Sequence, residues 1–180
     1  PKTSIVLTDA MAATAHLSPD GRYLVILSAS FANDPQEPPR YRVYEAATGR
    51  QIGAFAGDHQ SAPVAFSADG RLIAAETPRH TVTIWDPSHP DSPRVLPENR
   101  TPVTAIAFSP DRSRIATYSD QGITLFDAAS GMPLLVLRES NGPFSSREII
   151  LPGRLLQSSP ALAFSADGRQ ILLTTIASDP

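Results

Sequence analysis

Phe66-Ser67-Ala68-Asp69-Gly70-Arg71 is one of four copies of a short motif that recurs along this chain of 180 residues. The other copies are Leu17-Ser18-Pro19-Asp20-Gly21-Arg22, Phe108-Ser109-Pro110-Asp111-Arg112 and Phe164-Ser165-Ala166-Asp167-Gly168-Arg169. Their serines are 49, 42 and 56 residues apart. Such self-similarity is typical of a repeat protein with units of roughly 40–50 residues and some insertions.

Each copy of the motif predicts a β-hairpin, because it lies between two short apolar stretches. In the second copy these stretches are 63–66 and 72–75. Asp-Gly supplies the turn, since glycine adopts a positive φ without steric cost. Bulky and small residues alternate before each turn, as in Val64-Ala65-Phe66, which predicts a strand suited to a crowded innermost position. Arg112 replaces the glycine of the third copy, so we expect that turn to be strained or differently shaped.

A second pattern follows the first three copies and consists of an apolar residue, an aromatic residue and an acid. The three examples are Val43-Tyr44-Glu45, Ile84-Trp85-Asp86 and Leu125-Phe126-Asp127. Two of them continue into turn sequences at 46–49 and 128–131, and then into apolar stretches at 52–55 and 133–137. Each unit is therefore expected to contain four strands joined by short turns.

Together the two patterns resemble the repeats of WD-repeat β-propellers, and Trp85-Asp86 is the literal dipeptide of that family. The resemblance covers nearly the whole chain, although the repeats are degenerate. The family's Gly-His pair survives only as Gly57-Asp58-His59, and Asp120 is the one aspartate at the expected network position. The hairpins also resemble those of Tol-type and prolyl-oligopeptidase-type propellers.

The resemblance implies an all-β fold, a β-propeller of four-stranded antiparallel blades in which Tyr44, Trp85 and Phe126 fill the spaces between sheets. The units are roughly 12–58, 59–101, 102–157 and an incomplete 158–180, with 1–11 as the remnant of a preceding strand. That is about three and a half blades, whereas propellers close with four to eight. We therefore expect a partial propeller, a fragment whose remaining blades lie in the same polypeptide. A homodimer that completes the ring is the alternative.

Composition and charge exclude several kinds of partner and chemistry. The net charge is −3 and the charged residues are scattered, so neither nucleic acid nor a membrane is an expected partner. The lack of cysteine excludes disulfides, thiolate nucleophiles and cysteine-ligated zinc. We expect a cytoplasmic location, with a periplasmic or extracellular one left open. A single lysine, Lys2, and 18 prolines suggest a GC-rich, bacterial source.

No catalytic, cofactor-binding or metal-binding residue is predicted. The four histidines lie in different segments without ligand spacing, and no nucleophile elbow, phosphate-binding loop or dinucleotide fingerprint is found. We expect His16 on an innermost strand and His59 in a turn at a blade edge. The recurring turn aspartates are expected to be structural, because every repeat has one. The histidines are His16, His59, His80 and His89.

Two insertions interrupt the repeat, at 30–40 and at 140–159, and the second could hold a short helix or an extra strand around 148–156. Long loops on a rigid scaffold often carry binding residues. Tolerated surface excursions are the alternative interpretation.

The resemblance implies a non-catalytic protein-interaction scaffold. Its partner would lie across the face formed by the loops that enter each innermost strand and the loops between second and third strands. The residues expected there are Gln60, Ser61, Arg79, His80, Arg100, Thr101, Asp120, Gln121, Ser158 and Ser159. The alternative is a sensor or regulatory propeller attached to a catalytic domain elsewhere in the parent chain, such as a kinase, a caspase-like domain or a serine hydrolase.

Overall fold

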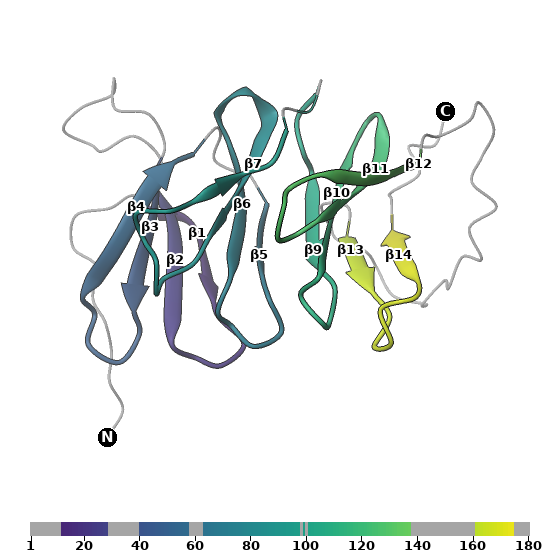
Figure 1. The fold of residues 1–180 in the computed structure, drawn as a ribbon. Helices are drawn as coiled ribbons and strands as arrows, with labels where there is room; N and C mark the ends of the chain where they lie inside the picture. The colour runs from purple at the N-terminus through teal and green to yellow at the C-terminus, as the bar shows by residue number, and fades with distance from the viewer. Residues whose placement is uncertain are drawn as a thin grey trace, which may run out of the picture.

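The computed structural model describes residues 12–28, 40–57, 63–97, 99, 101–137 and 161–174, and these residues form antiparallel sheets (Figure 1). We call the sheets blades 1 to 4. Blade 1 contains β1 (Ala12–Leu17), β2 (Tyr23–Ser28), β3 (Arg40–Glu45) and β4 (Gln51–Ala56). Blade 2 contains β5 (Val64–Phe66), β6 (Ile73–Thr77), the 3-10 turn η1 (Pro78–His80), β7 (Thr81–Trp85) and β8 (Arg94–Val95).

Blade 3 contains β9 (Ala105–Phe108), β10 (Arg114–Ser119), β11 (Gly122–Asp127) and β12 (Pro133–Leu137). Within the described residues blade 4 has two strands, β13 (Ala161–Phe164) and β14 (Ile171–Thr174). In each blade the strands pair in chain order, and every pair is antiparallel.

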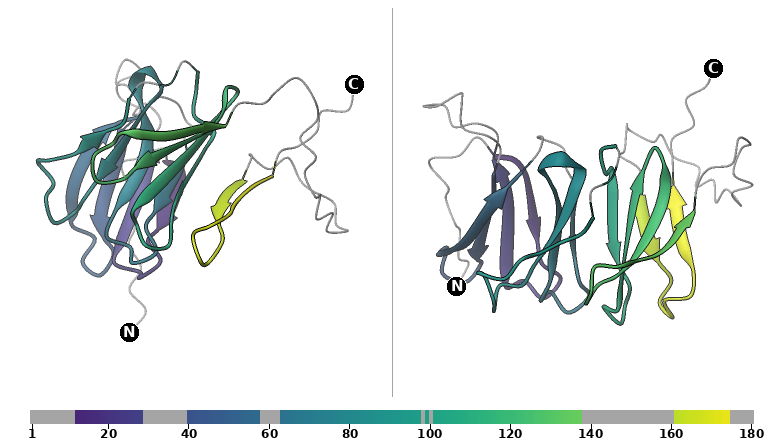
Figure 2. Two further views of the ribbon diagram at one scale, coloured as in Figure 1. Left: turned by 45° about the vertical axis from the view of Figure 1, so that its right-hand side comes forward. Right: turned by 45° about the horizontal axis from the view of Figure 1, so that its top comes forward.

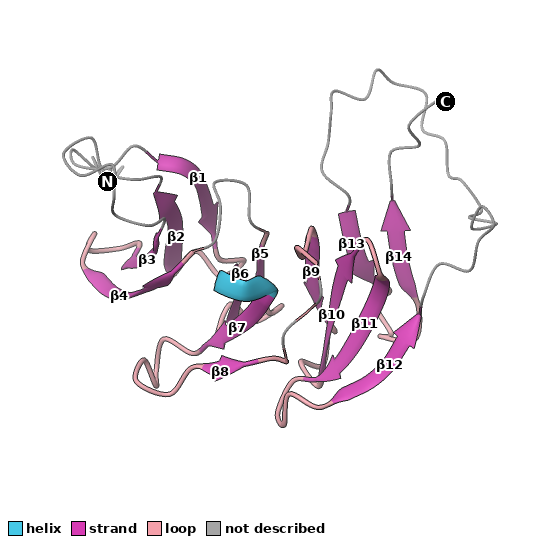
Figure 3. Cartoon of the chain, turned by 90° about the horizontal axis from the view of Figure 1, so that it is seen from above, coloured by secondary structure: helices cyan, strands magenta, loops and turns pink. Residues whose placement is uncertain are grey.

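The blades stand side by side along an arc, as the two views of Figure 2 show. The first strands of neighbouring blades meet on the inner side, where β9 contacts both β5 and β13. The fourth strands, β4, β8 and β12, lie on the outer side (Figure 3). This is the radial arrangement of a propeller, so the prediction of an all-β propeller with about three and a half blades is confirmed.

Side-chain hydrogen bonds close the recurring hairpin turns. In blade 1 the Ser18 hydroxyl donates to Oδ1 of Asp20 at 2.6 Å and accepts the backbone N–H of Tyr23 at 2.9 Å. Equivalent bonds recur in the other three turns. In blade 3, hydrogen bonds from Ser109 and Ser113 lower the pKa of Asp111 to about 2. The serine and aspartate of the motif are therefore structural, as expected.

Arg112 forms the same turn as the glycines it replaces. Its φ is 63°, against 69° for Gly70, so the turn keeps its shape and the arginine carries the strain. A left-handed conformation costs an L-residue about 1–2 kcal/mol. The Arg112 side chain also reaches blade 2, where its Nη1 lies 2.6 Å from Oδ2 of Asp69. Arg112 thus joins two neighbouring turns.

Successive side chains of a strand point to opposite sides of the sheet, and blade 2 has apolar side chains on both sides. On one face Trp85 packs among Val25, Leu27, Tyr41 and Val43 of blade 1. The Trp85 ring lies so close to β4 that a Cβ on Gly53 would be 2.5 Å from its Cζ2 atom. The indole N–H donates to the backbone oxygen of Pro90 at 3.1 Å.

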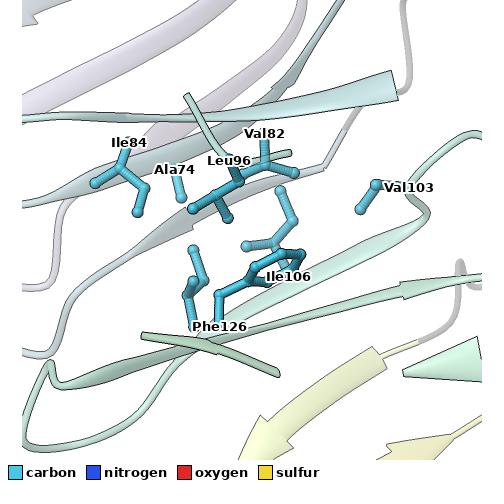
Figure 4. Packing of buried hydrophobic residues seen from close by; sticks show 8 residues of the cluster. Ala74, Val82, Ile84, Leu96, Val103, Ile106 and Phe126 are labelled. Carbon is cyan, nitrogen blue, oxygen red and sulfur yellow. The ribbon is translucent and has the colours of Figure 1, made fainter. Parts of the chain in front are cut away.

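The other face of blade 2 packs on blade 3 (Figure 4). Val82 and Ile84 meet Ile106, Ile115 and Phe126 there. The expectation that Trp85 and Phe126 fill the spaces between sheets is therefore confirmed. Tyr44 is also buried, but it lies outside both of these interblade clusters.

The two described strands of blade 4 cover the inner part of blade 3. Its Leu162, Phe164, Ile171 and Leu173 pack on a cluster formed by Ala116, Ile123 and Leu125. The outer strand β12 remains exposed along its whole length, and Met132 beside it is 66% exposed.

The structure tests some of the sequence-based predictions for single residues and segments, whereas others concern residues that it does not describe. His16 lies on β1, an innermost strand as expected, where partial burial lowers its pKa. His59, the segment 1–11, residues 30–39 of the first insertion and the second insertion lie outside the described residues. Among the described residues, no helix has the length and apolar character needed to span a membrane.

We predict that Trp85→Ala lowers the free energy of unfolding by about 3–5 kcal/mol, because it removes a large buried aromatic side chain between two blades. Urea denaturation followed by far-UV circular dichroism measures the change. Met132→Ala is the control and should cost less than about 0.5 kcal/mol, as exposed positions usually do. Equal effects of the two substitutions would contradict the assignment of Trp85 to the core.

Candidate interaction face

Three connections of blades 2 and 3 gather at one end of the strands, which we call the upper face. They are η1 between β6 and β7, the described residues 96–97, 99 and 101–104 between β8 and β9, and the turn 119–122 between β10 and β11 (Figures 1 and 3). The recurring Ser-Asp turns lie at the opposite, lower end. Of the residues that the sequence predicts for this face, the structure describes five and places them here: Arg79, His80, Thr101, Asp120 and Gln121. The other five lie outside the described residues: Gln60, Ser61, Arg100, Ser158 and Ser159.

The turn η1 has an unusual backbone. Arg79 and His80 both have left-handed conformations, with φ of 66° and 57°. Two consecutive residues of this kind are rarely stable without support from their surroundings. Thr81 supplies part of that support, since its hydroxyl donates to the backbone oxygen of Pro78 at 3.0 Å.

Asn99 ties η1 to the connection between blades 2 and 3. Its backbone N–H and its side-chain Nδ2 both donate to the carbonyl oxygen of His80, at 3.1 and 3.0 Å. The left-handed turn is therefore held from outside as well as from within.

Glu76 is the residue of this region that the sequence interpretation missed. Its side chain is fully buried in β6, and Oε1 accepts the backbone N–H of Val103 at 2.7 Å. The same oxygen lies 3.6 Å from Nδ1 of His80. Because Val103 begins the approach to β9, one carboxylate connects blade 2, η1 and blade 3. The available signal in the sequence was an acid directly after the apolar run Ile73-Ala74-Ala75, in the middle of a predicted blade.

The second part of the face joins the connection to blade 3. The Thr101 hydroxyl donates to Oδ1 of Asp120, and the Gln121 amide donates to the same oxygen at 3.3 Å. Asp120, the one network aspartate found in the sequence, thus bonds to Thr101 of the preceding connection. The structure therefore brings Thr101, Asp120 and Gln121 together, and Asn99 links His80 to the same segment.

Among the described residues, no group of three metal-ligating side chains is arranged to hold an ion. Ser, His and Asp do meet at Asp86, Ser88 and His89, in the turn between β7 and β8. There the Ser88 hydroxyl donates to Asp86 at 2.6 Å, and the His89 side chain is 75% exposed. These bonds cap a local turn and do not activate the serine as a nucleophile.

Comparisons with known proteins agree with this architecture. The family model for the WD domain, G-beta repeat (WD40) matches residues 90–127, a stretch that includes Asp120 and Phe126-Asp127. The solved structure of U3-55K superposes with a TM-score of 0.60 and 13% identity, covering 86% of this chain and 42% of that one. The WD40 repeats of RRP9 superpose with a TM-score of 0.59 and 14% identity, at the same coverage.

These likenesses confirm the resemblance to WD-repeat β-propellers, and the chain has their fold. It spans 42% of the length of each of these two structures. No curated protein matches the sequence. Since 949 chains of solved structures match, the fold alone selects no single function.

We predict that Glu76→Ala lowers the free energy of unfolding by about 2 kcal/mol or more, because it leaves a cavity and an unbonded backbone N–H at Val103. Glu76→Gln should cost less, since the amide oxygen can still accept that bond. Thermal and urea unfolding of both variants measure the difference. If alanine and glutamine were equally tolerated, Glu76 would not connect the blades.

Proposed function

We propose that this chain is part of a non-catalytic protein-interaction scaffold whose partner binds at the upper face. The observation that carries the proposal is the set of bonds that fixes this face across two blades. Glu76 holds Val103, Asn99 holds His80, and Thr101 is bonded to Asp120. A surface that is already rigid loses little conformational entropy on binding.

The fold supports the same role. WD40 propellers generally act without catalysing reactions, and a face of loops on a rigid sheet scaffold is where binding residues tend to lie. We propose a protein partner at this face, with neither nucleic acid nor a membrane as ligand. The net charge of −3 agrees with this choice.

The remaining blades of the ring are proposed to lie in the same polypeptide. The two similar structures are each more than twice as long as the part this chain covers. The exposed apolar strand β12 beside the two-stranded sheet of blade 4 agrees with the proposal, because such a surface is normally covered. One alternative is that a second copy of the chain completes the ring. Another is that the propeller is a sensor or regulatory domain attached to a catalytic domain in the parent chain.

Site-specific photo-crosslinking tests the interaction face. A photoreactive amino acid at Gln121, on the upper face, should form an adduct with a protein partner in cells that express the protein. The same amino acid at Arg169, exposed in a lower turn, is the matched control and should form little adduct. Adducts of equal yield at both positions, or adducts at Arg169 alone, would contradict the proposal.

A further inference from the structure

We infer that the partner segment held at the upper face is acidic and that Arg79 is its anchoring residue. The inference rests on the proposed function and adds the chemistry of the ligand. An acidic segment here means an extended peptide with aspartate or glutamate side chains.

The first step is the environment of Arg79. Its side chain is exposed, and no carboxylate of the described residues lies within ion-pair distance of it. At the lower end Arg22 lies 3.5 Å from Asp20 and Arg112 lies 2.6 Å from Asp69, whereas Arg114 and Arg169 make no ion pair with the described residues. With respect to the described residues, Arg79 therefore keeps its guanidinium donors available for an external carboxylate.

The second step concerns the carboxylates of the upper face. Glu76 is fully buried and is occupied by the backbone N–H of Val103. Asp120 is exposed, and its charge would repel an acidic ligand. However, one oxygen of Asp120 already accepts hydrogen bonds from Thr101 and from the side-chain amide of Gln121. This oxygen is therefore less able to pair with the Arg79 guanidinium. Among the described acids, none is positioned to neutralise Arg79.

The third step is the way the backbone presents this side chain. The left-handed conformations of Arg79 and His80 turn the chain sharply, and Asn99 fixes the turn through two bonds to the His80 carbonyl. Backbone strain of this kind is concentrated at active sites and ligand-binding positions. A shape that is held in this way before binding favours a bidentate guanidinium–carboxylate contact.

Titration of the isotopically labelled chain with two short peptides tests the inference by NMR. The acidic probe is acetyl-Gly-Glu-Glu-Asp-Glu-Gly-amide, and the neutral probe has glutamine and asparagine in place of the acids. We expect the acidic peptide to shift the backbone amides of 79–81 and 120–121. The neutral peptide should bind at least about tenfold more weakly, as the loss of a charge-assisted contact predicts.

Arg79→Gln should weaken binding of the acidic peptide by about tenfold. The substitution removes the positive charge but keeps a long, unbranched polar side chain at the left-handed position. Arg71→Gln is the matched control, since Arg71 is exposed in a lower turn near Asp69, and it should change binding less than about twofold.

The inference is overturned if the acidic peptide does not bind, if its shifts map to the lower turns, or if Arg79→Gln binds it as tightly as the unaltered chain. Crosslinks from position 121 to a protein partner would still support the proposed function in those cases. Loss of those crosslinks, with peptide binding intact, would instead contradict the proposed function.

Discussion

Packing between the apolar faces of neighbouring sheets is the interaction on which the rest of this structure depends. A blade of four short strands cannot bury both of its faces by itself, so each blade needs the next one. Blade 2 shows this most clearly, because Trp85 points to blade 1 while Val82 and Ile84 point to blade 3. Alternate residues of the one strand β7 therefore stabilise two different interfaces.

Polar bonds act on top of this packing and set how the blades are aligned. At the lower end the Asp20 carboxylate lies against the turn of blade 2, where a Cβ on Gly70 would be 2.5 Å from Oδ1. One blade further on, Arg112 occupies the equivalent position and pairs with Asp69 instead. At the upper end the buried carboxylate of Glu76 makes the corresponding connection. Polar contacts therefore link neighbouring blades at both the lower and the upper ends.

The fold could be predicted from the sequence, whereas only part of the candidate site could. The hairpins were predictable because a repeated Ser-Asp-Gly turn and alternating apolar residues are local signals. A fourth strand was expected in blade 2, but its position was not located, since Arg94-Val95 is short and follows a proline-containing turn. Glu76 was missed because its role comes from Val103, 27 residues away. The left-handed conformations of Arg79 and His80 were not predictable because no glycine marks the turn in the sequence. Asn99, which is distant in the sequence, helps to stabilise the turn.

Native-state hydrogen exchange tests the dependence of the blades on one another most directly. If interblade packing provides the stability, amides of β2, β6 and β10 should open together, with one common free energy that approaches that of global unfolding. The amides of β14, whose sheet has two strands in the described residues, should open at a lower free energy. Separate opening energies for blades 1, 2 and 3, or full protection of β14, would contradict the account.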